Sequence, residues 1–182
     1  MQKNWYKEMV VYQVWPRSFK DSNGDGIGDL EGIYSKLDYI KSIGIDAIWF
    51  SPLFCSPNAD YGYDISDYRN ISPDYGDNEL FKKVLDEAHK RGIKVIMDLV
   101  VNHSSDEHEW FKQGIDKNSK YHDYYIWRDG KGDNPPNNWD SIFSGSAWNY
   151  YPERKQWALH LFSKKQMDFN WENEALRQDL YK

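Results

Sequence analysis

The sequence contains a single cysteine, Cys55, and no long run of apolar residues. One cysteine excludes a disulfide within the chain, and no motif around Cys55 would activate its thiolate as a nucleophile. The apolar runs fall well short of the roughly 18 residues that a membrane-spanning helix needs. The N-terminal residues also lack the apolar core of a signal peptide. We therefore expect a soluble protein of the cytoplasm with no membrane partner.

The sequence also has fewer basic than acidic residues: 23 Lys and Arg compared with 29 Asp and Glu, which gives a formal net charge of -6. Nucleic acids and anionic membranes would repel such a chain on average, so a neutral ligand is favoured. The sequence also has no Walker or dinucleotide-binding glycine loop, no nucleophile elbow and no His/Cys cluster with transition-metal spacing.

Aromatic residues, in contrast, make up 17% of the chain, with 9 Trp and 14 Tyr. Many of them lie in segments rich in Gly, Pro and Asn, which are too polar to form an ordinary core. Aromatic faces stack against the C–H surfaces of sugars, whose hydroxyls bind Asp, Asn and His. The composition thus favours a carbohydrate ligand, although core packing is the alternative for any single ring.

Strand and helix patterns alternate in the first half of the chain, which predicts an α/β fold with a parallel sheet. Aromatic and β-branched runs predict strands at residues 9–15, 45–50 and 93–101. Apolar residues at helical spacing, from Leu30 to Ile40, predict one helix that stops before Gly44, and a second helix is predicted between the cap Asp77 and the stop Gly92.

The rhythm ends after His103, and residues 104–165 read as an insertion with one strand at residues 157–162. Asn173 is a cap for a further helix over residues 174–182. A closed eight-stranded barrel takes about 250 residues, and three strands are recognised here. We therefore predict the N-terminal part of a (β/α)8 TIM barrel: barrel units at 1–103, an insertion at 104–165, and a return to the barrel at 166–182 that ends inside a helix.

Polar side chains follow the second and third predicted strands. Asp98 and His103 lie at and beyond the end of the 93–101 strand, and Asp60 and Tyr63 follow the strand that ends at residue 50. Ligand sites of α/β barrels lie beyond these carboxyl ends. The alternatives are a carboxylate satisfied by backbone donors for Asp98 and a hydrogen-bonded loop histidine for His103. Residues 107–109 (Glu-His-Glu) are interpreted as the solvated start of a helix.

A loop at residues 21–29 places oxygen-bearing side chains at alternate positions between glycines. This spacing suits a hard cation, and we predict a structural calcium site. The position that would supply the bidentate Glu of an EF-hand is Gly32, so a calcium sensor is rejected. A metal-free turn rich in Asx residues is the alternative. The predicted ligands are the side chains of Asp21, Asn23, Asp25 and Asp29 and the carbonyl of Ile27.

Six segments form a series of motifs that spans nearly the whole chain in order: residues 11–19, 21–29, 62–68, 98–103, 138–148 and 165–171. In this series the chain resembles the α-amylase superfamily of glycoside hydrolases (family 13), most closely its α-glucosidase and oligo-1,6-glucosidase branch. The length and order of the series make the resemblance specific. It implies a (β/α)8 barrel whose domain B is the insertion after strand three.

The resemblance also implies a subsite for the non-reducing glucose. Asp98 would hold one sugar hydroxyl and orient the ring, and His103 would donate to another. Met167 stands where the family usually has Pro, which makes the placement of Gln166 less fixed. The residues implied to line the subsite are Asp60, Tyr63, Asp98, His103, Phe143, Phe162 and Gln166.

The activity implied by the resemblance is retaining hydrolysis of α-glucosidic bonds in short oligosaccharides. Two carboxyl groups about 5 Å apart carry out such a reaction, one as nucleophile and one as acid and base. In this family they follow strands four and five, so this chain is expected to contain no catalytic residue and to be inactive alone. The alternatives are a trehalose-6-phosphate hydrolase, a sucrose isomerase, a non-catalytic amylase-like carbohydrate-binding protein and a calcium-regulated module. The oligomeric state is left open.

Overall fold

The computed structural model of the protein describes residues 4–182, which divide into two compact units. Among the described residues, the first unit comprises residues 4–55 and 68–99, and the second comprises residues 56–67 and 100–182. The second unit therefore takes a short segment, 56–67, from within the predicted barrel units. The three-part division of the sequence by position in a barrel stays a prediction.

A parallel sheet forms the centre of the first unit, in the order β1-β2-β5. Its strands are β1 (Val11–Val14), β2 (Ala47–Phe50) and β5 (Lys94–Met97). Val11 is opposite Ala47, and Ala47 is opposite Lys94, so the three strands run in register along their whole length. A two-stranded pair, β3 (Phe54–Cys55) with β4 (Asp67–Ile71), follows β2.

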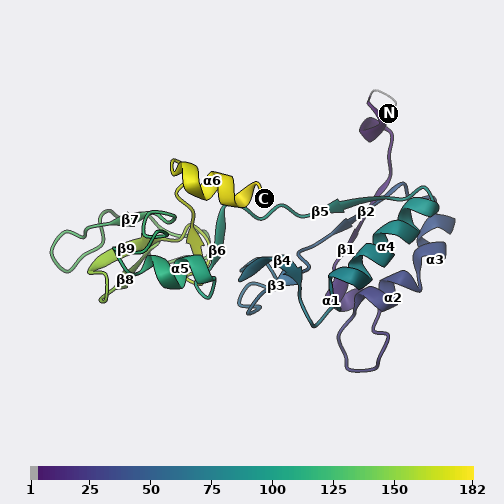
Figure 1. The fold of residues 1–182 in the computed structure, drawn as a ribbon, viewed down its shortest axis with the longest axis horizontal. Coiled ribbons are helices and arrows are strands. Elements are labelled where there is room, and N and C mark those ends of the chain that lie inside the picture. The colour runs from purple at the N-terminus through teal and green to yellow at the C-terminus, as the bar shows by residue number, and fades with distance from the viewer. Residues whose placement is uncertain (1–3) are drawn as a thin grey trace. The chain divides into compact units, whose positions relative to one another are not determined.

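Helices pack together on one side of this sheet, as Figure 1 shows for α2, α3 and α4. They are α1 (Pro16–Phe19), α2 (Leu30–Tyr34), α3 (Leu37–Ser42) and α4 (Asn78–Lys90), and a short 3-10 helix, η1 (Trp5–Lys7), precedes the sheet. Asp77 caps α4 by accepting a hydrogen bond from the backbone N–H of Leu80, as the sequence predicts. Gly92, at φ +69, follows the end of α4 and leads into β5.

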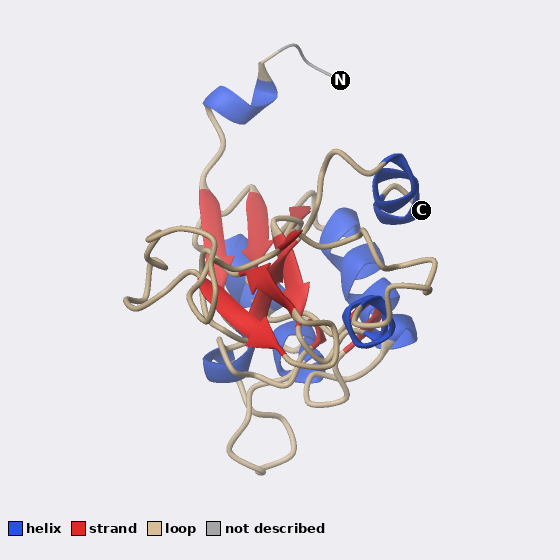
Figure 2. Ribbon diagram, turned by 90° about the vertical axis from the view of Figure 1, so that its left-hand side faces the viewer, coloured by secondary structure: helices blue, strands red, loops and turns tan. Residues whose placement is uncertain are grey.

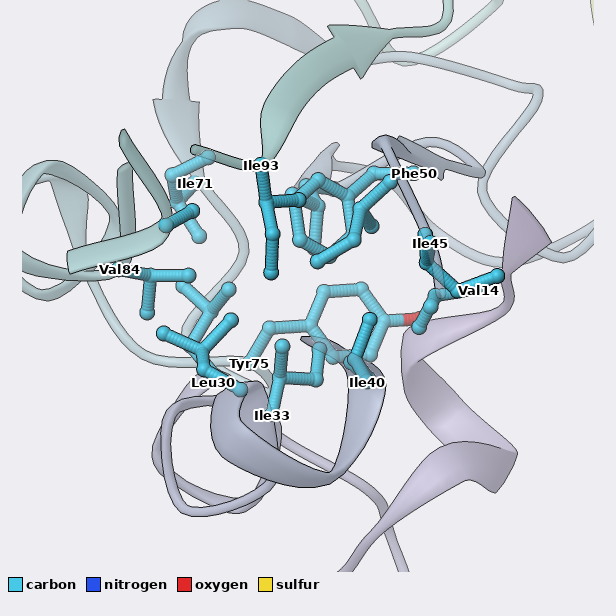
Figure 3. Packing of buried hydrophobic residues seen from close by; sticks show 14 residues of the cluster. Val14, Leu30, Ile33, Ile40, Ile45, Phe50, Ile71, Tyr75, Val84 and Ile93 are labelled. Carbon is cyan, nitrogen blue, oxygen red and sulfur yellow. The ribbon is translucent and has the colours of Figure 1, made fainter. Parts of the chain in front are cut away.

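The core of the first unit lies between the sheet and these helices (Figure 3). Phe50 from β2, Val84 from α4 and Ile33 from α2 point into it and are fully buried. Burial of one such side chain contributes about 1.5–3 kcal/mol relative to its exposure. The helical spacing read from the sequence therefore identified the faces that hold this unit together.

The strand predicted over residues 93–101 is shorter than expected. β5 ends at Met97, which pairs with Phe50, the last residue of β2. Ser51 and Pro52 follow β2, and proline has no N–H to continue the hydrogen-bond ladder between the two strands. Leu99, expected to be buried in the strand, is 81% exposed.

The helix predicted from Leu30 to Ile40 is two helices, because the chain departs from helical geometry at Lys36. Ser35 ends α2, and its hydroxyl donates to the carbonyl oxygen of Gly32 at 2.6 Å. Such a side-chain bond competes with the backbone ladder and bends or ends helices. The apolar residues keep their helical spacing across the break, which is why the sequence alone predicted one element.

The second unit contains two antiparallel sheets and two helices. One sheet pairs β6 (His103–Ser105) with β10 (Gln166–Asp168), and the other has the order β7-β9-β8. The strands of the latter are β7 (Trp127–Arg128), β8 (Trp148–Tyr151) and β9 (Gln156–Leu159). The helices are α5 (Glu109–Gly114) and α6 (Glu174–Leu180), and the side chain of Asn173 caps α6 as expected.

Aromatic rings fill the interior of the second unit. Phe111 of α5 stacks on Trp127 with ring centroids 5.4 Å apart, and the guanidinium of Arg154 lies 4.4 Å from the Trp127 ring. Phe111 also meets Tyr125 edge to face at 4.9 Å. Many of the aromatic residues that the composition assigned to a sugar site are therefore core residues of this unit.

Across the described part of the chain, residues 4–182, no helix is long and apolar enough to pass through a membrane.

Candidate functional site

The second unit brings four of the predicted glucose-binding residues into direct contact. The side-chain amide of Gln166 lies at the centre: its Nε2 donates to Oδ2 of Asp60 at 2.9 Å and lies 3.1 Å from Nε2 of His103. The same imidazole nitrogen lies 3.0 Å from the carbonyl oxygen of Tyr63. We call Asp60, Tyr63, His103 and Gln166 the polar cluster.

Strands β6 and β10 position two members of this cluster. Gln166 pairs with Ser105, and His103 pairs with Asp168, so the two side chains lie on adjacent antiparallel strands. Gln166 is fully buried, and His103 is 5% exposed. The backbone N–H of Ser163 donates to Oε1 of Gln166 at 2.9 Å, which fixes the orientation of the amide. Met167, the next residue of β10, stands where the family usually has Pro and is fully buried.

The other two members lie on the loop at residues 56–67, which a buried carboxylate organises. Asp64 is fully buried and accepts hydrogen bonds from the hydroxyl of Ser56 and the backbone N–H groups of Ala59 and Asp60, each at 2.9 Å. Tyr61 is at φ +48, in the left-handed region, which tightens this turn. The sequence pattern singles out the nearby Asp60 and Tyr63 but indicates no role for Asp64.

The two predicted phenylalanines adjoin the polar cluster. The ring of Phe162 lies 5.2 Å from that of His103 and 6.2 Å from that of Phe143, measured between centroids. Phe143 is 55% exposed and presents its ring at the surface. A cavity of about 410 Å³ borders both rings, and its other walls include Trp148, Asn149 and His160.

Asp98 is a residue of the first unit, directly after β5. The structure therefore describes six of the seven predicted subsite residues within one unit, and Asp98 in the other. The prediction that Asp98 binds glucose remains a prediction.

The electrostatics of the polar cluster keep its histidine neutral. Burial lowers the pKa of His103, and this outweighs the opposing effects of the Tyr63 carbonyl and of the carboxylates of Asp60 and Asp64. A neutral imidazole has one N–H donor and one acceptor, so the group that each ring nitrogen contacts depends on the position of the ring proton. Together with a carboxylate and a fixed amide, such a cluster suits the hydroxyl groups of a sugar ring.

His108, interpreted from the sequence as part of a solvated helix start, is in fact buried. It is 6% exposed, its Nδ1 accepts from the N–H of Trp110 at 3.0 Å, and burial lowers its pKa to about 4. Its ring also packs against that of Trp110, with centroids 4.6 Å apart. The helix does start here, but its cap is a neutral core residue.

The predicted calcium loop connects α1 to α2 and projects away from both, as Figure 1 and the rotated view in Figure 2 show. The carboxylate of Asp21 accepts backbone N–H groups of Asn23, Gly24 and Gly26, and the bonds from Gly26 and Gly24 hold its pKa below the ordinary value. Asp25 accepts from the backbone N–H of Ile27.

Asp29 closes the loop. Its Oδ1 accepts from the N–H of Gly32, which caps α2, and its Oδ2 accepts from the hydroxyl and N–H of Ser22. Burial works to raise the pKa of Asp29, but these hydrogen bonds outweigh it and leave that pKa lowered. Within residues 4–182, no three acidic, histidine or cysteine side chains gather in a geometry that could hold a metal ion. The donors of the loop have the chemistry of a calcium site, while their present contacts are those of an Asx-rich turn.

Known proteins resemble the chain along its full length. The oligo-1,6-glucosidase of Parageobacillus thermoglucosidasius is 58% identical over 182 residues, which are all of this chain and 32% of that protein. The oligo-1,6-glucosidase of Bacillus cereus is 60% identical over all of this chain and 33% of its own length. The chain thus spans about a third of the length of these curated relatives.

Solved structures agree. The trehalose-6-phosphate hydrolase of Bacillus licheniformis matches 97% of this chain and 32% of its own, at 55% identity and a TM-score of 0.95. A mutant of MutB in complex with the substrate sucrose matches 98% of this chain and 32% of its own, at 54% identity and the same TM-score. These neighbours confirm the fold predicted from the sequence, the N-terminal part of a (β/α)8 barrel with a domain B insertion.

The sequence profile of the alpha-amylase catalytic domain matches residues 13–182. The chain therefore belongs to the alpha-amylase family of glycoside hydrolases.

Proposed function

We propose that the protein to which this chain belongs is a retaining α-glucosidase of the oligo-1,6-glucosidase type, which cleaves short α-glucosides. The polar cluster is the observation that carries this proposal. It presents a fixed amide that lies 2.9 Å from a carboxylate and 3.1 Å from a neutral imidazole, and an aromatic ring packs beside that imidazole. The relatives named oligo-1,6-glucosidase support the choice of substrate class.

In this proposal the polar cluster and Phe162 hold the non-reducing glucose, with Phe143 as an outer wall and Asp98 as a further hydroxyl ligand. Asp60 accepts from a sugar hydroxyl while Gln166 anchors its other side. No residue of the chain acts as nucleophile or general acid, so the 182 residues alone bind sugar without turning it over. Clear hydrolysis of a chromogenic α-glucoside by the isolated chain would contradict this division of roles.

The proposal is tested with Gln166→Met in the full-length protein. Met has a similar volume but cannot donate to Asp60, so we expect KM for isomaltose to rise about tenfold, as for one lost hydrogen bond to a charged group. Gln178→Ala on α6 is the matched control, because Gln178 is exposed and bonds to Glu174 within its own helix. Unchanged kinetics in Gln166→Met would remove the polar cluster from the substrate site.

A second candidate activity is that of a trehalose-6-phosphate hydrolase or a sucrose isomerase. It is supported by the similarity to the solved structures of a trehalose-6-phosphate hydrolase and of MutB with sucrose, at 55% and 54% identity. Because the polar cluster would hold the same glucose unit in each case, the structure favours none of them. Steady-state kinetics with isomaltose, trehalose 6-phosphate and sucrose separate them: a kcat/KM for isomaltose below that for either other sugar would replace the leading proposal.

We also propose that the loop at residues 21–29 binds a structural calcium ion through Asp21, Asn23, Asp25, Ile27 and Asp29. The alternating oxygen donors support this. Calorimetric titration of chelator-treated full-length protein should show one calcium site that is lost in Asp25→Asn. Asp133→Asn, which changes another exposed loop aspartate, is the control and should bind calcium as the parent protein does.

We also propose that the protein is located in the cytoplasm. The single cysteine of the chain supports this location, because disulfides are typical of oxidising compartments.

A further inference from the structure

A second buried carboxylate lies behind the polar cluster and is used by none of the roles above. Asp168 is the last residue of β10 and pairs with His103 of β6. It is 4% exposed, and its Oδ1 accepts from the backbone N–H of Leu161 at 3.0 Å. Its position therefore puts a fixed acceptor beside the strand that carries the imidazole.

Asn102 connects this carboxylate to the imidazole. Its side chain hydrogen-bonds to Asp168, and its Nδ2 lies 3.2 Å from Nδ1 of His103. A carboxylate can only accept, so Asn102 must present its NH₂ group to Asp168. The second hydrogen of the same NH₂ group then points to Nδ1 of His103, which must act as the acceptor.

The opposite side of the ring requires the same proton position. Nε2 of His103 lies 3.0 Å from the carbonyl oxygen of Tyr63, which can only accept. The ring proton therefore resides on Nε2. Two independent contacts, one at each nitrogen, are satisfied by this tautomer.

A competing arrangement is built into the cluster. Nε2 of Gln166 is a donor and lies 3.1 Å from Nε2 of His103. With the ring proton moved to Nδ1, His103 could accept from Gln166, provided that the Asn102 amide turned its oxygen toward Nδ1. The imidazole would then offer no N–H to the cluster. The carboxylate of Asp168 opposes this turn, because it would face the amide oxygen.

We infer that Asp168 is a positioning residue that acts through the Asn102 amide to hold His103 as the tautomer with its proton on Nε2. The imidazole is thereby kept as a donor within the polar cluster. The catalytic consequence rests on the proposed function, in which His103 contacts the sugar; the tautomer itself does not.

Stability gives little reason to keep a carboxylate at this position. Burial raises the pKa of Asp168 to about 6, and the hydrogen bonds from Leu161 and Asn102 only partly oppose this shift. At neutral pH the group is ionised in an environment that disfavours the charge. A role in orienting a neighbouring group accounts for a residue that folding alone does not favour.

The test is NMR of histidine ring carbons and nitrogens in the full-length protein, with ¹³C,¹⁵N-labelled histidine and His103 assigned by its loss in His103→Gln. We expect the parent protein to show the Nε2–H tautomer. In Asp168→Asn the ratio of tautomers should shift toward Nδ1–H by about tenfold, the effect of one hydrogen bond. The His108 and His160 signals report whether the fold is intact.

A carboxylate exchange decides the matter if Asp168→Asn fails to fold. In the double variant Asn102→Asp with Asp168→Asn, the charge is conserved but now lies against Nδ1, so His103 should become the Nδ1–H tautomer. An Nε2–H tautomer in this variant, or an unshifted ratio in a folded Asp168→Asn, would overturn the inference.

Kinetics separate this inference from the proposed function. If both hold, Asp168→Asn lowers kcat/KM for isomaltose about tenfold, and Asn102→Ala lowers it equally. Adding Asp168→Asn to Asn102→Ala should then cost nothing further, because the carboxylate acts through the amide. A tautomer shift without any change in kcat/KM would leave the inference standing and remove His103 from the substrate site.

Discussion

Gly32 offers a sharp test of how the loop at residues 21–29 is joined to α2. A Cβ atom at this position would lie 2.0 Å from the carbonyl oxygen and 2.8 Å from the carbonyl carbon of Lys20, whereas ordinary contacts begin at 3.4 Å. Lys20 cannot simply move away, because its carbonyl accepts from the N–H of Asp29 at 3.0 Å. Gly32→Ala therefore requires a shift of about 1.4 Å between two backbone segments.

The magnitude follows from opposing effects. Alanine is favoured over glycine in a helix by about 0.5–1 kcal/mol. Overpacking costs about 1–3 kcal/mol, and loss of an N-cap bond such as that from Gly32 to Asp29 costs about 1 kcal/mol. Leu30 and Ile33 on either side are fully buried, so the helix cannot rotate to relieve the contact without exposing them. We expect a net loss of about 2 kcal/mol in the free energy of unfolding.

Equilibrium unfolding in urea, followed by tryptophan fluorescence, measures this loss as a shift of the midpoint at constant slope. The control is Glu31→Ala, the preceding residue of the same helix, which is half exposed and makes a 3.7 Å ion pair with Lys83. It should change the free energy of unfolding by less than about 0.5 kcal/mol. Equal stability of the two variants would refute the close approach of Gly32 and Lys20. The same contact explains why the position that would carry the glutamate of an EF-hand holds a glycine.

Three further predictions concern the carboxylate and imidazole groups of the fold. Asp64→Asn retains only one acceptor oxygen for the donors from Ser56, Ala59 and Asp60, and it should therefore loosen the loop that carries Asp60. We expect kcat/KM for isomaltose to fall about tenfold, and unchanged kinetics would contradict this role. The pKa of His108 is about 4 in the folded state and 6.5 in the unfolded state. As the pH falls from 6.5 to 4, only the unfolded state gains a proton at this residue. The free energy of unfolding should therefore decline by about 3 kcal/mol over that range. His108→Asn keeps a helix cap but removes this loss of stability. If the urea midpoint of the variant falls between pH 7 and pH 4.5 as much as that of the parent protein, the buried His108 does not cause the loss. Asp77→Ala should cost about 1 kcal/mol through loss of the cap of α4, seen as a lower urea midpoint, and a neutral result would mean that the helix does not need its cap.

The parts of the fold that the sequence predicted are those with local, periodic signals. β1, β2 and β5 are apolar runs that are connected by helices along the chain. The end of α4 is marked by Gly92, whose positive φ is a local requirement of the backbone. The sheet β7-β9-β8 has strands of two to four residues, and its rings Trp127 and Tyr151 pack against Phe111 of α5 rather than follow a periodic pattern. Period-two alternation cannot be recognised in two residues, so only residues near β9 were predicted as a strand.

The predicted site shows the same limit. Their positions after predicted strands identified Asp60 and His103, and the resemblance to the α-amylase superfamily added Gln166. The structure places these residues in hydrogen-bond contact although Gln166 lies more than a hundred residues from Asp60. The sequence pattern could not identify Asp64 or Asp168, because a buried carboxylate is defined by its donors, and these are mostly backbone N–H groups with no sequence signature. Whether an aspartate faces a ligand or supports a loop is decided by burial.

The arrangement of the second unit explains how a polar cluster can be buried at all. His103, Gln166, Asp64 and Asp168 are each at most 5% exposed, and unsatisfied polar groups of this kind cost about 1–3 kcal/mol each. Their donors and acceptors are matched in nearly every case by groups on β6, β10 and the loop at residues 56–67. The aromatic packing around Phe111 and Trp127 supplies the apolar burial that such a short-stranded unit would otherwise lack. Loss of one aromatic contact should therefore loosen the polar cluster as a whole, since the hydrogen bonds hold geometry but contribute little net stability.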